Sequence, residues 1–189
     1  YGPWDKAPNL GNGRLGARIH GQVKNEIITL NEITLWAGYP RNWNDPEIRN
    51  VLKEVRQLLL AGRNGEADVK ARQLQSLNNE PYLPLGNLRL DLDDGDQYSD
   101  YRTTLDLDSA MVQTCYKIGS KNYSRDMFIS YPDQVFVIRL STDQPEGLGF
   151  RASLDCQLRC RVVSERHDCL VLQGRAPYFN DTMSKETLY

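Results

Sequence analysis

Hydrophobic and polar residues alternate near the start of the chain, over residues 14–20. One side of this segment would carry Leu15, Ala17 and Ile19, and the other Arg14, Arg18 and His20. A period of two is typical of a half-buried strand. Residues 26–30 continue as a return strand, and Gly11-Asn12-Gly13 predicts a turn because glycine and asparagine tolerate positive φ. The pattern predicts an antiparallel hairpin with one face on a core.

The period changes to that of a helix over residues about 45–78. Asp45 is suited to the N-cap, Pro46 to the first turn and Gly62 to the C-terminal stop. Between them, apolar residues recur at helical spacing: Ile48, Val51, Leu52, Val55, Leu58 and Leu59. A second, weaker helix is expected at about 66–77. Together they predict a helical hairpin inserted between strands.

Alternation returns from Tyr82 onward and is interrupted by regular turn signals. Strands are predicted over 85–92, 103–107, 110–118, 123–130, 135–140, 148–158, 161–163 and 169–173. Short strands at this spacing favour a mainly β fold, an antiparallel β-sandwich of supersandwich-like type. We expect residues 1–175 to form this domain, with the helical insert at about 45–78. Residues 176–189 have no core pattern and are expected to begin a linker.

Charge and cysteine content exclude several classes of function. The net charge is −2 with both signs mixed, which gives no signal for nucleic acid. No apolar run of about 18 residues is present, so no membrane-spanning helix is expected. Cys156, Cys160 and Cys169 lack a fourth ligand at zinc-finger spacing, so no metal is expected. A metal site that also uses the nearby His167 is a minor alternative. Free buried thiols are favoured, and a Cys156–Cys169 bridge stays open.

The glycine motif at Gly11, Gly13 and Gly16 matches GxGxxG but lacks a preceding strand and a following helix. We therefore expect no dinucleotide and no other cofactor. Glycoside hydrolysis usually uses two carboxyl groups, and the candidates in this sequence are Glu32, Asp106, Asp108, Asp126 and Asp133. Each has a simpler explanation in a turn or on a polar strand face. No catalytic residue is assigned.

The remaining candidate chemistry is an aromatic loop containing Trp36, Tyr39 and Trp43. Aromatic faces beside hydrogen-bond donors suit the apolar and polar sides of a sugar. The favoured alternative is that these rings pack on the helical hairpin or a neighbouring domain. We also expect Arg14 to pair with Glu32. The candidate residues for substrate binding or a domain interface are Asn12, Arg14, Glu32, Trp36, Tyr39 and Trp43.

Several sequence blocks carry a family resemblance. They are GNGRLGA at 11–17, LNEITLW at 30–36, YRTTLDLDSA at 101–110 and SYPDQV at 130–135. In this order they resemble the amino-terminal domain of glycoside hydrolase family 95, the α-L-fucosidases. The chain departs from the usual pattern at Arg18, Ile33, Ala37 and Tyr39.

The resemblance implies inverting hydrolysis of fucosyl linkages in an (α/α)6 catalytic barrel that follows the sandwich. The catalytic motifs of that barrel are absent from these 189 residues, so the chain alone is expected to be inactive. The implied partners are the C-terminal barrel of the same polypeptide and fucosylated oligosaccharide. A bacterial, periplasmic or secreted protein is also implied. The alternatives are an independent carbohydrate-binding module and a purely structural domain, and the choice of fucose or galactose stays open.

Overall fold

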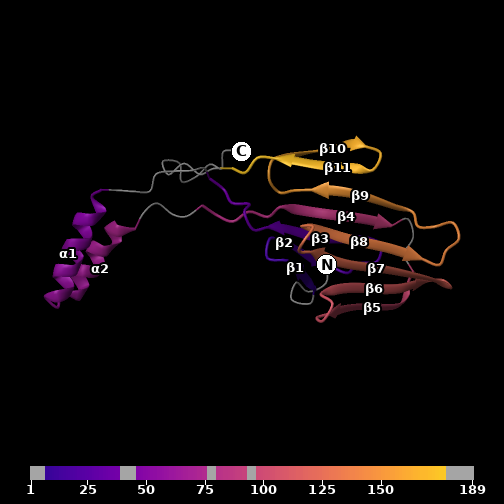
Figure 1. The fold of residues 1–189 in the computed structure, drawn as a ribbon, viewed down its shortest axis with the longest axis horizontal. Coiled ribbons are helices and arrows are strands. Elements are labelled where there is room, and N and C mark those ends of the chain that lie inside the picture. Colours follow the sequence, from indigo (N-terminus) through magenta and orange to yellow (C-terminus); the bar gives the residue numbers. More distant parts are fainter. Residues whose placement is uncertain (1–6, 39–45, 76–79, 93–96, 178–189) are drawn as a thin grey trace. The chain divides into compact units, whose positions relative to one another are not determined.

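A computed structural model describes residues 7–38, 46–75, 80–92 and 97–177. The chain divides into two compact units. One contains the residues up to Ala37 together with Tyr82–Pro177, and holds all the strands of the described chain. The other is the segment Gly38–Pro81, which holds the two helices α1 and α2 (Figure 1). Each unit is described by itself below.

The first layer of the strand unit is a five-stranded antiparallel sheet in the order β1-β2-β3-β4-β9. Its strands are β1 (Asn9–Gly11), β2 (Leu15–Ile19), β3 (Asn25–Glu32), β4 (Gly86–Leu92) and β9 (Phe150–Asp155). The predicted hairpin is β2 and β3, and the predicted turn at Asn12 joins β1 to β2. Strand β1 was not predicted, because three residues are too few to show alternation.

The second layer is a four-stranded antiparallel sheet in the order β5-β6-β7-β8. Its strands are β5 (Ser99–Asp106), β6 (Met111–Ile118), β7 (Lys121–Ser130) and β8 (Val135–Thr142). A separate two-stranded hairpin consists of β10 (Cys160–Arg166) and β11 (Cys169–Gly174). Most bounds lie within one or two residues of the predicted ones, whereas β5 begins four residues earlier than expected.

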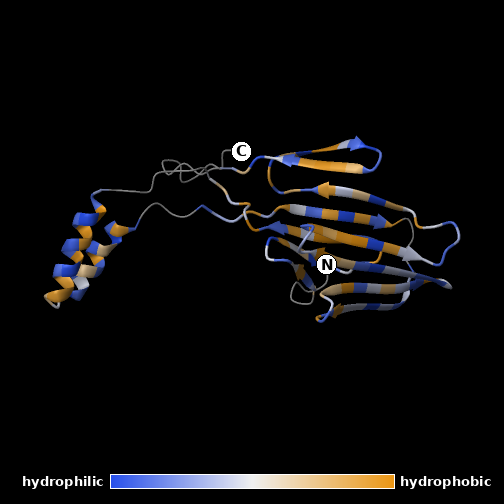
Figure 2. Cartoon of the chain, in the orientation of Figure 1, coloured by the Kyte–Doolittle hydropathy of each residue, from blue (hydrophilic) through white to orange (hydrophobic). Residues whose placement is uncertain are grey.

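The hydrophobic core joins the two larger sheets. Its buried members from the first sheet are Leu10, Ala17, Ile19, Ile28 and Leu90, and those from the second are Val112 and Met127. The contributing strands supply alternate residues, as Ala17 and Ile19 do in β2, and hydrophobic and hydrophilic bands alternate along the strands in Figure 2. Full burial of one such aliphatic side chain stabilises the fold by about 1.5–3 kcal/mol. The predicted antiparallel sandwich with a helical insertion is therefore confirmed.

The helical unit interrupts the chain between β3 and β4, which nevertheless pair directly. It contains α1 (Ile48–Leu60), α2 (Asn64–Ala71) and a 3-10 turn, η2 (Arg72–Leu74). Gly62 ends α1 as predicted, since its φ of 72° is favourable only for glycine. Pro46 lies in the turn before α1, and the proposed cap Asp45 lies outside the described residues. None of the described helices is long and apolar enough to cross a bilayer.

All four cysteines are free and half-buried rather than buried. The Cys156–Cys169 bridge that the sequence left open is not formed, for a reason of register. Cys160 lies opposite Gly174, whereas Cys169 lies opposite Arg166 at the far end of the β10–β11 hairpin. Cys156, which precedes Cys160 by four residues, therefore belongs to the other end. Within the described ranges, no three His, Cys, Asp or Glu side chains are grouped to hold a metal ion.

Candidate functional site

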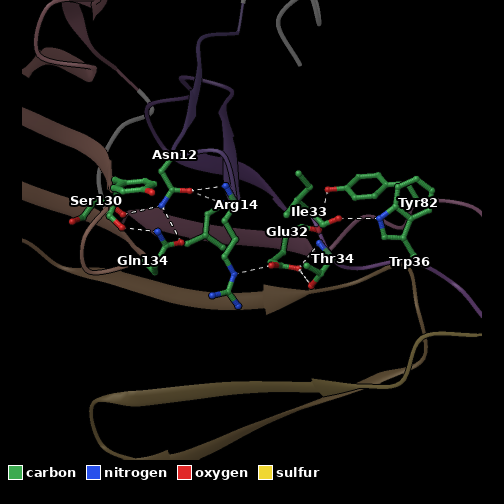
Figure 3. A network of polar contacts seen from close by, with 11 residues as sticks. Asn12, Arg14, Glu32, Ile33, Thr34, Trp36, Tyr82, Ser130 and Gln134 are labelled. Carbon is green, nitrogen blue, oxygen red and sulfur yellow. Dashed lines mark hydrogen bonds and ion pairs between the residues drawn. The ribbon is translucent and has the colours of Figure 1, made fainter. Parts of the chain in front are cut away.

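Asn12 lies in the turn between β1 and β2 and organises it from within. Its Oδ1 accepts hydrogen bonds from the backbone N–H groups of Arg14 (3.0 Å) and Leu15 (2.8 Å). Its Nδ2 donates to the carbonyl of Ser130 at 2.8 Å and to Oε1 of Gln134 at 3.4 Å (Figure 3). Since Ser130 ends β7, this amide ties a turn of the first sheet to the second sheet.

Arg14 and Glu32 form the ion pair expected from the sequence. Arg14 Nε lies 2.9 Å from Glu32 Oε1; Arg14 directly precedes β2, and Glu32 is the last residue of β3. The Arg14 side chain is 60% exposed. Among the described residues, its two terminal nitrogens have no hydrogen-bond partner, and in Figure 3 they point away from Glu32. The guanidinium is therefore oriented by Glu32 and retains an unused edge of donors.

Glu32 is held in its ionised form. Its Oε2 accepts hydrogen bonds from the backbone N–H of Thr34 (2.8 Å) and from the Thr34 hydroxyl (2.5 Å). These bonds to Thr34, and then the bond from Arg14, lower the pKa of Glu32 below its ordinary value. A general acid at neutral pH needs the opposite shift. Glu32 is therefore suited to orienting Arg14 and not to protonating a leaving group.

Trp36 and Tyr82 join the two chain segments that flank the helical insertion. The residues form an antiparallel bridge, and their rings meet edge to face with centroids 5.3 Å apart. The indole N–H donates to the carbonyl of Ile33 at 2.9 Å, and the Tyr82 hydroxyl donates to the carbonyl of Glu32 at 3.1 Å. Trp36 remains 50% exposed and Tyr82 41% exposed. Both rings are thus fixed in direction while half of their surface is uncovered.

The structure brings together four of the six predicted site residues, Asn12, Arg14, Glu32 and Trp36, along one hydrogen-bonded stretch (Figure 3). The other two, Tyr39 and Trp43, lie outside the described residues. Sequence reasoning missed Tyr82, which follows the helical insertion. The sequence feature that could have indicated Tyr82 is its position just after the helical insertion. Trp36 lies just before the insertion, so the two rings meet where the chain leaves and re-enters the strand unit.

Three of the four remaining acidic candidates accept local hydrogen bonds, and the fourth, Asp108, donates its backbone N–H to Asp106 Oδ1 at 3.0 Å. Asp106 accepts from the hydroxyl of Ser109 at 2.7 Å, and this bond is the main cause of a lowered pKa for Asp106. Asp126 accepts from the side-chain amide of Gln113 at 2.7 Å, and Asp133 from the Ser130 hydroxyl at 2.6 Å. Of the four predicted site residues that the structure describes, Glu32 alone carries a carboxyl group. These four residues therefore contain no pair of carboxyl groups of the kind that glycoside hydrolysis usually requires.

A buried ion pair between the sheets was also missed. Arg125 on β7 is 1% exposed and Glu26 on β3 is fully buried, with Nη1 and Oε2 2.9 Å apart. Arg125 also donates to the carbonyls of Gln22 and Val23. Burial raises the pKa of Glu26 to about 7, although the Arg125 charge and the Gly21 N–H oppose this. The sequence could have indicated this pair, because strand alternation places both charged residues on the faces of their strands that point into the core.

Comparisons with known proteins identify the family of this chain. Residues 2–188 match the family described as glycosyl hydrolase family 65, N-terminal domain. The chain is 35% identical to Alpha-L-fucosidase 2 of Arabidopsis thaliana over 158 residues, which is 82% of this chain and 19% of that protein. It is 35% identical to Probable alpha-fucosidase A of Aspergillus niger over 141 residues, covering 71% of this chain and 18% of that protein. In Aspergillus oryzae, Probable alpha-fucosidase A is 30% identical over 149 residues, covering 74% of this chain and 20% of that protein.

The chain thus spans about a fifth of the length of the curated relatives it matches. The resemblance seen in the sequence blocks, to the amino-terminal domain of an α-L-fucosidase-like glycoside hydrolase, is confirmed at this level. The sandwich, the order of those blocks along the chain and the family match lead to one assignment: the chain belongs to the family of glycosyl hydrolase family 65 N-terminal domains.

Proposed function

We propose that this chain is the non-catalytic amino-terminal domain of a family 95 α-L-fucosidase-like enzyme and that it packs on an (α/α)6 catalytic barrel of the same polypeptide. The observation that carries the proposal is the share of the relatives that it matches, about a fifth of proteins named as α-fucosidases. The hydrogen bonds of Glu32, Asp106 and Asp126 support it, because each carboxylate already accepts a hydrogen bond from a neighbouring residue.

The surface proposed to meet the barrel consists of Arg14, Ile33, Trp36 and Tyr82. It combines half-exposed rings and an exposed Ile33 with a guanidinium whose free edge can take a carboxylate or a backbone carbonyl. Aromatic residues and arginine are the types enriched at protein interfaces, and they contribute most when an interface buries them fully.

Two measurements test the proposal. An aryl α-L-fucoside should be hydrolysed by the polypeptide that includes the barrel and not by the 189-residue chain. In the barrel-containing polypeptide, Trp36→Ala and Arg14→Ala should lower the thermal midpoint by several degrees, whereas Thr104→Ala, an exposed position on the other sheet, should not. Hydrolysis by the chain alone would refute the non-catalytic role, and unchanged midpoints would refute the proposed contact.

The second candidate function is an independent carbohydrate-binding module. It is favoured by the half-exposed Trp36–Tyr82 pair, whose rings offer an apolar face beside the Arg14 donors. Isothermal titration of the chain with fucosylated oligosaccharide distinguishes the two functions. Saturable heat that disappears in Trp36→Ala or Trp43→Ala supports the module, and no heat at millimolar ligand supports the packing role.

A further inference from the structure

The outer face of the five-stranded sheet carries a row of polar residues across all of its strands. The register places Asn9 opposite Arg18, Arg18 opposite Thr29, Thr29 opposite Asn87, and Asn87 opposite Asp155. Their neighbours Leu10, Ala17 and Ile28 belong to the core on the other face. Alternation therefore directs the polar row away from the sandwich interior.

This outer face is hollowed over β1, β2 and β3. The hollow has a volume of about 340 Å³, and its lining consists of Leu10 and Ala17 together with Asn9, Gly16, Arg18, His20, Thr29 and Asn31. We call it the Gly16 groove. Its size lies at the lower end of the range of small-molecule sites, which are about 300–1,000 Å³. Arg14, Trp36 and Tyr82 are not among its lining residues, so it is distinct from the surface discussed above.

Gly16 forms part of this hollow and is not required by the backbone. Gly13 and Gly21 have φ values of 89° and 74°, whereas Gly16 is not among the glycines with positive φ. A Cβ at Gly16 would meet only Asn31 Cβ at 3.7 Å and the Leu10 carbonyl at 4.0 Å, which are ordinary contacts. Glycine inside a strand weakens it and often marks a place where a ligand or another backbone approaches. The missing side chain keeps the groove open.

The walls of the groove present paired donors and acceptors. Arg18 Nε donates to Asn9 Oδ1 at 3.0 Å, and His20 Nε2 lies 3.2 Å from the Thr29 hydroxyl oxygen. Burial, and then the charge of Arg18, lower the pKa of His20, so its ring is neutral at neutral pH. Amide, hydroxyl and neutral imidazole groups both donate and accept hydrogen bonds, as each hydroxyl of a sugar does.

We propose that the Gly16 groove binds a neutral pyranose unit through hydrogen bonds to its hydroxyl groups. Among the described lining residues there is no carboxylate that would select a cation and no Trp, Tyr or Phe ring that would stack on the sugar. Recognition by hydrogen bonds without stacking predicts a dissociation constant in the millimolar range, about −4 kcal/mol at 1 mM. This binding does not depend on whether the domain also packs on a barrel.

The test is an amide NMR titration of the ¹⁵N-labelled 189-residue chain with methyl α-L-fucopyranoside and, separately, methyl β-D-galactopyranoside. At least one sugar should shift the amides of Gly16, Thr29 and Asn31 in a saturable way. Gly16→Val should weaken this response at least about ten-fold, because its branched side chain fills the hollow while suiting a strand. The matched control Thr104→Val, on the outer face of the other sheet, should leave the response unchanged.

Three outcomes would overturn the proposal: no saturable shift up to about 100 mM sugar, an unchanged response in Gly16→Val, or shifts confined to the surroundings of Trp36. The last outcome, with loss in Trp36→Ala, would assign binding to the aromatic pair and so support the second candidate function instead. If Gly16→Val fails to fold, Asn31→Ala removes one wall of the groove and must weaken the same shifts.

Discussion

Replacing Arg125 by methionine tests the ion pair that joins the two sheets. Methionine keeps an unbranched side chain but leaves Glu26 without its partner, and it removes the donors to the carbonyls of Gln22 and Val23. At pH 8 the Glu26 carboxyl, with a pKa of about 7, is mostly ionised in the wild-type fold. The variant therefore creates a buried, unpaired charge or forces that carboxyl to take up a proton.

Removal of one partner from a buried ion pair costs about 3–5 kcal/mol. This is a large share of the roughly 5–15 kcal/mol by which a domain is stable. In urea, a loss of about 4 kcal/mol lowers the unfolding midpoint by about 2 M when the slope is about 2 kcal/mol per M. The measurement is equilibrium unfolding followed by circular dichroism, with Arg139→Met as the control, because Arg139 is exposed on β8. That control should change the free energy of unfolding by less than about 0.5 kcal/mol.

A double variant separates the pair from the cavity that a substitution leaves. Arg125→Met combined with Glu26→Leu removes both charges, so it should be more stable than Arg125→Met alone. It should not regain wild-type stability, because the Gly21 N–H and the Gln22 carbonyl lose their partners. The reasoning that charge pairing across the sheets dominates this end of the core would be refuted by either of two results. One is that the losses in unfolding free energy of Arg125→Met and Glu26→Leu simply add in the double variant, and the other is a loss below about 1 kcal/mol in Arg125→Met.

Three further predictions concern pH, the first turn and its glycine. The folded-state pKa of Glu26 lies above the ordinary value of 4.5, so the stability that its protonated form contributes is full below pH 4.5 and is lost as pH rises through about 7. Glu26→Gln should remove this decline. The measurement is the free energy of unfolding between pH 4.5 and about 8. Asn12→Ala should cost about 1–3 kcal/mol in urea unfolding, and Asn12→Asp less, because aspartate keeps the acceptor for the turn and loses only the amide that donates to Ser130 and Gln134. Gly13→Ala should cost about 1–2 kcal/mol from its positive φ alone, since nothing lies within 4 Å of the added Cβ; an unchanged thermal midpoint would contradict this.

The sequence determined most elements of the fold through local patterns. Alternation placed β2, β3 and the strands from β4 onward, and Gly62 ended α1 where expected. The Arg14–Glu32 pair followed from the predicted hairpin, because both residues lie at its open end. The second helix was predicted too long, since its regular turns end at Ala71 and a 3-10 turn follows. Its few apolar positions could not define where packing stops.

Only the tertiary structure decided which residues meet across the sandwich. Glu26 and Arg125 are 99 positions apart, and Asn12 and Ser130 are 118 apart. Alternation says which face of a strand a residue occupies, but the partner on the opposite sheet depends on how the two sheets are shifted and rotated against each other. That arrangement is set by the whole core, in which many apolar contacts act together and no single segment contains the information. The Gly16 groove has the same origin, since three strands must be in register before one missing side chain leaves a hollow.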